Sequence, residues 1–395
     1  MPCEVNKERI VNMNILILSA STGGGHFKAS RALESYILEN EPDAKVKVVD
    51  TLEYVNPFIN KIVTKGYLVL AKYLNSLYKG IYSLTDKSGI LTSLVTKLIS
   101  LFSRRLLPLI DEFSPNVVIT THPFPTEMIS ILKGKKIIKV PSICIMTDYA
   151  PHNTWIKPNI DEYCVACEEM IEDMVSRGIP REKIHPYGIP VFKGFFHQDK
   201  EDKKILLKEL GLSENKMTVL VMAGSFGVYN IEKIYKNISD ISMDFQIVIL
   251  TGNNKRLYNK MKQLVESSNK HTRLIKFTDE VYRYMNLSDV LITKPGGLTV
   301  SEALASNLPL ITFDAIPGQE EANAKFLLNR GMSISIGKGD NCSEAIEALL
   351  RNEEKLKVIR EQCMKFDKSN STNELLELIR KLNKESETES DSEIA

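Results

Sequence analysis

Glycine loops that lead into helices are the features of this sequence with the clearest chemical use. Between an apolar run and a helical pattern, the segment Ser21–His26 carries three successive glycines, including Gly24 and Gly25. Glycine lets a ligand approach the backbone, and a helix N-terminus offers free N–H groups and a positive dipole end. Because that dipole disfavours imidazolium, we expect His26 to be neutral at pH 7, which suits a general base.

Two later loops have a similar setting. Gly224–Gly227 (GSFG) follows another apolar run, where Ser225 could face a diphosphate. The segment Ile316–Asn323 (IPGQEEAN) follows a strand pattern and enters a helix. Its amides and carboxylates suit several hydroxyls of a hexose, although a capped and solvated helix start would have the same composition.

The segment Thr293–Glu302 (TKPGGLTVSE) is a fourth loop of this kind. An apolar run ends at Pro-Gly-Gly, and a helix is expected to begin near Leu298 or Thr299. Phosphates would bind at that N-terminus. Glu302 follows about one turn later, where its carboxylate could accept hydrogen bonds from both hydroxyls of a ribose. A first-turn acid that only complements the helix dipole is the alternative.

These loops require a parallel sheet to position them. Short apolar runs that alternate with helical patterns favour doubly wound α/β domains, and the alternation occurs twice. We expect strands over 14–20, 45–50, 117–121, 142–147, 163–166, 218–223, 245–251, 272–277, 290–293 and 310–313. The predicted parts are a flexible N-terminus (1–12), two domains (13–192 and 193–368), a C-terminal helix (369–384) and a disordered acidic tail (385–395).

Composition narrows the class of protein. The chain has 395 residues, of which 43% are apolar, and a formal net charge of +1, which predicts no nucleic-acid partner. Six cysteines in a chain of this length do not indicate a disulfide framework. No run approaches the roughly 20 apolar residues that span a bilayer. No Asp-x-Asp triplet occurs, so no metal and no cofactor are expected, and backbone N–H groups and helix dipoles would stabilise a leaving diphosphate.

The region 57–110 departs from this regular pattern. It is apolar and helical in pattern, and it carries eight basic residues and one acidic residue. A basic, tyrosine-containing, amphipathic region suits an anionic membrane surface. An ordinary helical subdomain with a solvated lysine face is the other interpretation.

The motifs together resemble the monogalactosyldiacylglycerol synthase and processive diacylglycerol glucosyltransferase group of glycosyltransferase family 28. In order, they are STGGGH, TDYAPHNTW, YGIPV, MAGSFG, TKPGGLTVSEAL and PGQEEAN, and the resemblance covers roughly residues 13 to 370. It implies a GT-B fold, in which two Rossmann-like domains face a cleft and the C-terminal helix returns to the N-terminal domain. It also implies an inverting, metal-independent transfer of a hexose from a UDP-sugar to diacylglycerol.

The resemblance also implies roles for individual residues. His26 would help to deprotonate the acceptor, and Asp148 could orient either His26 or the acceptor hydroxyl. The implied donor-binding residues are Gly24, Gly25, Ser225, Phe277, Thr278, Pro295, Gly296, Gly297, Leu298, Thr299, Glu302, Gln319, Glu320 and Asn323. The residues expected on the acceptor and membrane side are His122, His152, Trp155, Lys65, Lys72, Lys79, Arg104 and Arg105.

Several alternatives stay open at this point. The sequence does not choose glucose over galactose, although glucose is favoured because the whole chain resembles the bacterial glucosyltransferases. The rivals are a peptidoglycan-precursor N-acetylglucosaminyltransferase, a UDP-sugar epimerase, a non-catalytic UDP-sugar sensor and a nicotinamide enzyme that uses Asp50 as its ribose ligand. We expect a cytoplasmic protein bound peripherally to the inner face of the cell membrane. The oligomeric state is not predicted.

Overall fold

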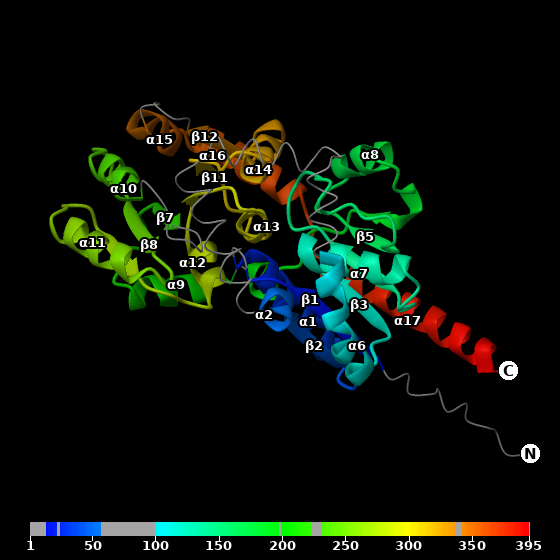
Figure 1. Cartoon of the computed structure of the whole chain (residues 1–395). Helices are drawn as coiled ribbons and strands as arrows, with labels where there is room; N and C mark the ends of the chain where they lie inside the picture. Colours follow the sequence, from blue (N-terminus) through cyan, green and yellow to red (C-terminus); the bar gives the residue numbers. More distant parts are fainter. Residues whose placement is uncertain are drawn as a thin grey trace, which may run out of the picture.

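The chain folds into two α/β domains that lie side by side (Figure 1). The computed structural model describes residues 13–21, 24–56, 99–196, 199–222, 231–336 and 342–394. Each domain is built on a six-stranded parallel sheet. The predicted fold class, two doubly wound α/β domains, is therefore confirmed.

The N-terminal sheet has the order β2-β1-β3-β4-β5-β6. Its strands are β1 (Asn14–Ser19), β2 (Lys45–Asp50), β3 (Val117–Thr120), β4 (Ser142–Ile145), β5 (Glu162–Cys164) and β6 (Ile184–His185). Its α-helices are α1 (Gly25–Asn40), α2 (Thr51–Val55), α6 (Leu107–Phe113), α7 (Pro123–Gly134) and α8 (Glu169–Ser176). The strand order reverses between β1 and β3, and ligands of doubly wound sheets bind at the carboxyl ends of such a pair.

The C-terminal sheet has the order β12-β11-β10-β7-β8-β9 and reverses between β7 and β10. Its strands are β7 (Thr218–Met222), β8 (Gln246–Leu250), β9 (Thr272–Ile275), β10 (Val290–Thr293), β11 (Leu310–Phe313) and β12 (Ser333–Ile336). Its helices are α9 (Lys200–Glu209), α10 (Ile231–Ser239), α11 (Lys255–Glu266), α12 (Val281–Leu287), α13 (Gly297–Ala305), α14 (Gln319–Asn329), α15 (Cys342–Leu350) and α16 (Glu353–Lys365). The loop after β10 therefore lies at the second reversal.

The predicted strands are all present, with ends that differ by at most two residues. They could be recognised as apolar runs because parallel strands are covered by helices on both faces. Strands β3, β4, β8, β10 and β11 are accordingly buried throughout. Two strands were not predicted. β6 has only two residues, and β12 (SISI) alternates serine with isoleucine and so has no apolar run.

The last helix, α17 (Ser371–Ile394), returns to the N-terminal domain, along which it runs in red in Figure 1. Leu375, Leu376 and Ile379 share a buried cluster with residues of β1 and α1. The predicted returning helix is thus present, but the prediction that 385–395 is disordered is wrong up to residue 394. Glutamate favours helix, and Lys381 lies 3.9 Å from Glu385 one turn later.

Candidate active site between the two domains

His26 lies at the start of α1, at the reversal point of the N-terminal sheet. Gly24 caps this helix with φ 76°, a left-handed conformation that glycine adopts without strain. The Nδ1 atom of His26 is 2.6 Å from the Oγ1 atom of Thr147. Its ring meets the His122 ring edge-on at 4.8 Å and lies 5.9 Å from the Trp155 ring.

Burial of this cluster controls its protonation. Burial lowers the pKa of His26 to about 4, against a weaker opposing effect of a hydrogen bond involving the Thr121 backbone. The pKa of His122 lies well below its ordinary value, chiefly because of burial and then because of the neighbouring His26. Both rings are therefore neutral at pH 7, as predicted for His26. A neutral imidazole can accept a proton from a hydroxyl.

The N-termini of α1 and α13 meet at the boundary between the domains. A methyl group added at Gly25 would touch the Cβ atom of Leu298 at 3.4 Å. One added at Gly297 would overlap the backbone carbonyl oxygen of Thr147. Gly297 therefore has a function that the sequence did not indicate, because it lets the two domains close on each other. Two positive dipole ends also converge here, which favours a bound anion.

Asp148 contacts the C-terminal domain and not His26. Its Oδ2 atom accepts from Gln319 at 3.3 Å, and its Oδ1 atom lies 3.5 Å from the Asn323 amide nitrogen. Asn323 also accepts from the backbone N–H of Tyr149 at 2.8 Å and donates to the carbonyl of Pro295 at 3.0 Å. Asp148 thus does not orient His26 here, and the fully buried Asn323 holds the domains together instead of facing open space.

Tyr149 adds a second set of contacts across this boundary. Its hydroxyl lies 2.8 Å from the Oγ atom of Ser301, which donates to the Gly297 carbonyl one turn earlier in α13. Its ring stacks on Phe326 of α14 at 4.4 Å. Residues 147–149 therefore all contact the C-terminal domain.

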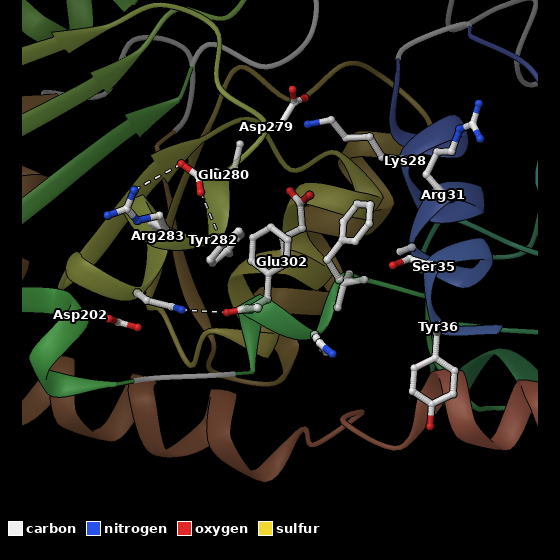
Figure 2. A pocket seen from close by; sticks show the side chains of 18 of the residues that line it. Lys28, Arg31, Ser35, Tyr36, Asp202, Asp279, Glu280, Tyr282, Arg283 and Glu302 are labelled. Carbon is white, nitrogen blue, oxygen red and sulfur yellow. Dashed lines mark hydrogen bonds and ion pairs between the residues drawn. The ribbon is translucent and has the colours of Figure 1, made fainter. Parts of the chain in front are cut away.

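Glu302 lines a cavity of about 1030 Å³ between α1 on one side and α9 and α12 on the other. Figure 2 shows its side chain projecting toward the middle of this cavity, with Lys28 extending from α1 on one side and Arg283 on the other. Phe277, which is 48% exposed, and Thr278 directly precede the cavity-lining loop after β9. Glu302 and residues 279–283 thus line one cavity, and the donor-binding roles of Phe277 and Thr278 stay predictions.

The structure also makes a prediction about Glu302. Burial raises its pKa from 4.5 to about 7, and the charge of Lys28 only partly offsets this effect. Ionising this buried carboxyl group therefore lowers the free energy of unfolding. This cost is absent below pH 4.5 and fully present above about pH 7. E302Q should therefore raise the free energy of unfolding at pH 8 by about 1–3 kcal/mol, with no gain at pH 4.5.

Denaturant unfolding at both pH values measures this difference. E361Q, at an exposed position on α16, is the matched control and should change stability little at either pH. An unchanged stability of E302Q at pH 8 would mean that the buried carboxylate is not disfavoured.

The acceptor-side predictions have mixed outcomes. Trp155 is only 1% exposed and lies against the His26 ring, so it is part of the interior beside His26, and its role toward the acceptor stays a prediction. His152 is buried, and its Nδ1 atom lies 2.8 Å from the Thr154 hydroxyl within its own loop. His122 caps α7 by accepting from the Phe124 N–H at 3.1 Å, besides packing on His26. His122 and Trp155 thus build the surroundings of His26, whereas the side-chain contact of His152 is within its own loop.

Other predicted residues cannot be placed in the site. Lys65, Lys72, Lys79 and Ser225 lie outside the described residues. Arg104 and Arg105 are exposed, and Arg105 donates to the carbonyl of Val55 at 2.7 Å.

Asp50, the proposed ribose ligand of a nicotinamide enzyme, has a structural role. Its Oδ1 atom accepts from the backbone N–H groups of Leu52 and Glu53 and so caps α2. Its Oδ2 atom accepts from the Ser21 N–H at 3.2 Å. The feature that suggested the nicotinamide alternative is thus explained by helix capping.

Two residues of this region were missed. Thr147 was not singled out, because a threonine at a strand end carries no chemical signature of its own. Lys294 is 9% exposed, directly precedes Pro295, and its Nζ atom lies 3.9 Å from Glu320. Burial raises the pKa of Glu320, and Lys294 opposes this effect. Lys294 could have been recognised from the sequence, because it lies between a strand end and a glycine loop, and P-loop lysines contact phosphates from comparable loops.

Within the described ranges, no three His, Cys, Asp or Glu side chains are grouped so that they could hold a metal ion. None of the helices in that part of the chain has the length and apolar character needed to cross a membrane.

Sequence comparison places the chain among lipid glycosyltransferases. The family model described as monogalactosyldiacylglycerol (MGDG) synthase matches residues 26–191, and that described as glycosyl transferases group 1 matches residues 202–366. The processive diacylglycerol beta-glucosyltransferase of Staphylococcus epidermidis is 30% identical over 374 residues, which cover 93% of each chain. The enzyme of that name from Bacillus pumilus is 28% identical over 371 residues, which cover 93% of this chain and 94% of the relative.

Solved structures share the fold at low identity. MurG of Acinetobacter baumannii superposes with a TM-score of 0.59 at 13% identity, over 93% of this chain and 99% of its own. The UDP-GlcNAc 2-epimerase of Neisseria meningitidis gives a TM-score of 0.58 at 15% identity, over 93% of this chain and 100% of its own. The predicted GT-B arrangement is confirmed, and at this identity the likeness concerns the fold alone.

Proposed function

Since the chain belongs to the processive diacylglycerol beta-glucosyltransferase family, we propose that it transfers glucose from UDP-glucose to the hydroxyl of diacylglycerol with inversion at the anomeric carbon. The names of the relatives supply the lipid and the sugar. One observation about the chain itself carries the chemistry: the neutral ring of His26 lies where the N-termini of α1 and α13 meet.

In the proposed reaction, Nε2 of His26 takes the proton of the lipid hydroxyl. The oxygen attacks the anomeric carbon as the bond from that carbon to the UDP oxygen breaks. The leaving diphosphate lies at the N-terminus of α13, beside Gly296 and Gly297, where backbone N–H groups and the helix dipole stabilise its charge. The negative charge of the bound diphosphate also raises the basicity of His26, which is low in the free protein.

The donor nucleoside is proposed to occupy the cavity lined by Glu302. Its carboxylate would accept from the ribose hydroxyls, and the loop with Phe277 and Thr278 would hold the uracil. Lys294 and Glu320 lie beside the phosphate loop and are proposed to contact the hexose or the diphosphate, with Gln319 at the same loop. UDP-sugar is a substrate in this scheme, and no cofactor or metal is used.

Peripheral contact with the inner face of the cell membrane is proposed for the side of the N-terminal domain that carries residues 99–105. Leu101 is 70% exposed, and the exposed Arg104 and Arg105 follow it. An exposed leucine next to cationic side chains favours an anionic bilayer surface.

A vesicle assay tests the proposal. Purified protein is incubated with anionic liposomes that contain diacylglycerol, with UDP-glucose or UDP-galactose in parallel, and with EDTA. We expect glucolipid from UDP-glucose only. Galactolipid alone would move the assignment to a galactosyltransferase. No glycolipid from either donor, despite measurable UDP binding, would overturn the diacylglycerol assignment and favour the peptidoglycan-precursor acceptor or a sensor role.

A further inference from the structure

We propose that Thr147 is the positioning residue of the reaction: its hydroxyl accepts a hydrogen bond from Nδ1–H of His26, which fixes the tautomer whose Nε2 lone pair faces the acceptor. This inference rests on the proposed function. The Oγ1 atom of Thr147 lies 2.6 Å from Nδ1 of His26. Thr147 follows the end of β4, and His26 lies in the first turn of α1, 121 positions earlier in the sequence.

The tautomer determines whether His26 can act. If Nδ1 carries the proton and donates it to Thr147, the lone pair on Nε2 is available for a substrate hydroxyl. If Thr147 instead donated to Nδ1, Nε2 would carry the proton and could not act as a base. The carboxylate that often orients a catalytic histidine is not used here, because the neighbouring Asp148 bonds to Gln319 and Asn323.

A neutral partner suits this position. A carboxylate on Nδ1 would favour imidazolium and raise the pKa of His26, whereas a hydroxyl orients the ring without adding charge. Thr147 is 3% exposed, so water competes little for this hydrogen bond. The histidine is thereby held neutral and oriented until a negatively charged donor arrives.

Thr147 also connects the orientation of His26 to the contact between the domains. Its carbonyl oxygen packs against Gly297 at the start of α13, where an added methyl group would overlap it. The next two residues, Asp148 and Tyr149, bond to Asn323. The hydroxyl of Thr147 is thus held over His26 by contacts with the domain proposed to bind the donor, so the base is oriented when the domains are closed.

A set of three variants tests this proposal. T147V preserves the shape of the side chain and removes its hydroxyl, and T147S restores the hydroxyl. T154V is the matched control, because it removes another threonine–histidine Nδ1 hydrogen bond, that to His152 in the same segment. We expect T147V to lower kcat roughly 10- to 100-fold with an unchanged KM for the donor, and T147S and T154V to stay near wild type.

The tautomer is read directly from ring ¹⁵N chemical shifts at pH 7, with the His26 signals assigned by their loss in H26A. We expect the Nδ1–H form in the wild type and T147S and a mixture in T147V. The Nε2–H form in the wild type, or a T147V protein with unchanged shifts and unchanged kcat, would overturn the proposal. This readout needs no lipid, so it stays informative even if the vesicle assay yields no glycolipid.

Discussion

Replacing His26 with alanine is expected to lower glucosyl transfer by roughly 10²- to 10⁴-fold while the affinity for UDP stays near that of the wild type. The side chain is proposed to take the acceptor proton, and no other base is proposed for the reaction. Its loss therefore acts on the transition state and not on donor binding. Transfer rates in the vesicle assay and calorimetric titration with UDP measure the two quantities.

The protonation of His26 gives a second observable for this prediction. Because burial holds its pKa at about 4, the ring should remain neutral down to about pH 5 in an NMR titration of the free protein. H271A, at an exposed position before β9, is the control and should transfer glucose at the wild-type rate. Near-normal transfer by H26A would show that another group is the base.

Substituting Gly297 with alanine is expected to lower glucosyl transfer by roughly 10²-fold or more, because it would change how the two domains are positioned relative to each other. The added methyl would overlap the Thr147 carbonyl oxygen, which belongs to the backbone and has little room to move. The domains would have to separate, and the contacts of Asp148 and Tyr149 with Asn323 would be lost with them.

Small-angle X-ray scattering measures whether the domains of G297A separate, and single-turnover kinetics measure its loss of glucosyl transfer. G296A is the matched variant for domain closure, because a methyl at that position meets none of the described atoms within 4 Å. We expect G297A to be more extended than both G296A and the wild type, with unfolding of each domain little changed. A G297A protein as compact and as active as the wild type would contradict the role assigned to this glycine.

Much of the fold could be predicted from the sequence because it is encoded locally. Parallel strands buried on both faces appear as apolar runs, and β2, β10 and β11 occupy the ranges predicted for them. The loops at the strand ends could be located for the same reason. Strands without an apolar run, such as β6 and β12, were missed, and the acidic end of α17 was taken for a disordered tail.

The contacts between the domains could not be predicted in this way. His26 and Glu302 could be identified because each follows a glycine loop at a helix start. The pairing of Asp148 with Asn323, which lie 175 positions apart, depends on how two separately folded sheets meet. The hydroxyl of Thr147 gains its importance from the same contact. No periodicity or motif encodes such a pairing, so residues of this kind need a three-dimensional structure to be recognised.

The anomeric configuration of the product lipid tests the central claim most directly. If the acceptor oxygen, deprotonated by His26, displaces UDP in one step, the α-linked glucose of UDP-glucose must become β-linked in the glycolipid. The proton NMR spectrum of lipid extracted from the vesicle reaction reports this configuration. We predict a β-linked glucosyl diacylglycerol from the wild type. An α-linked product would contradict the single displacement, and with it the role proposed for His26.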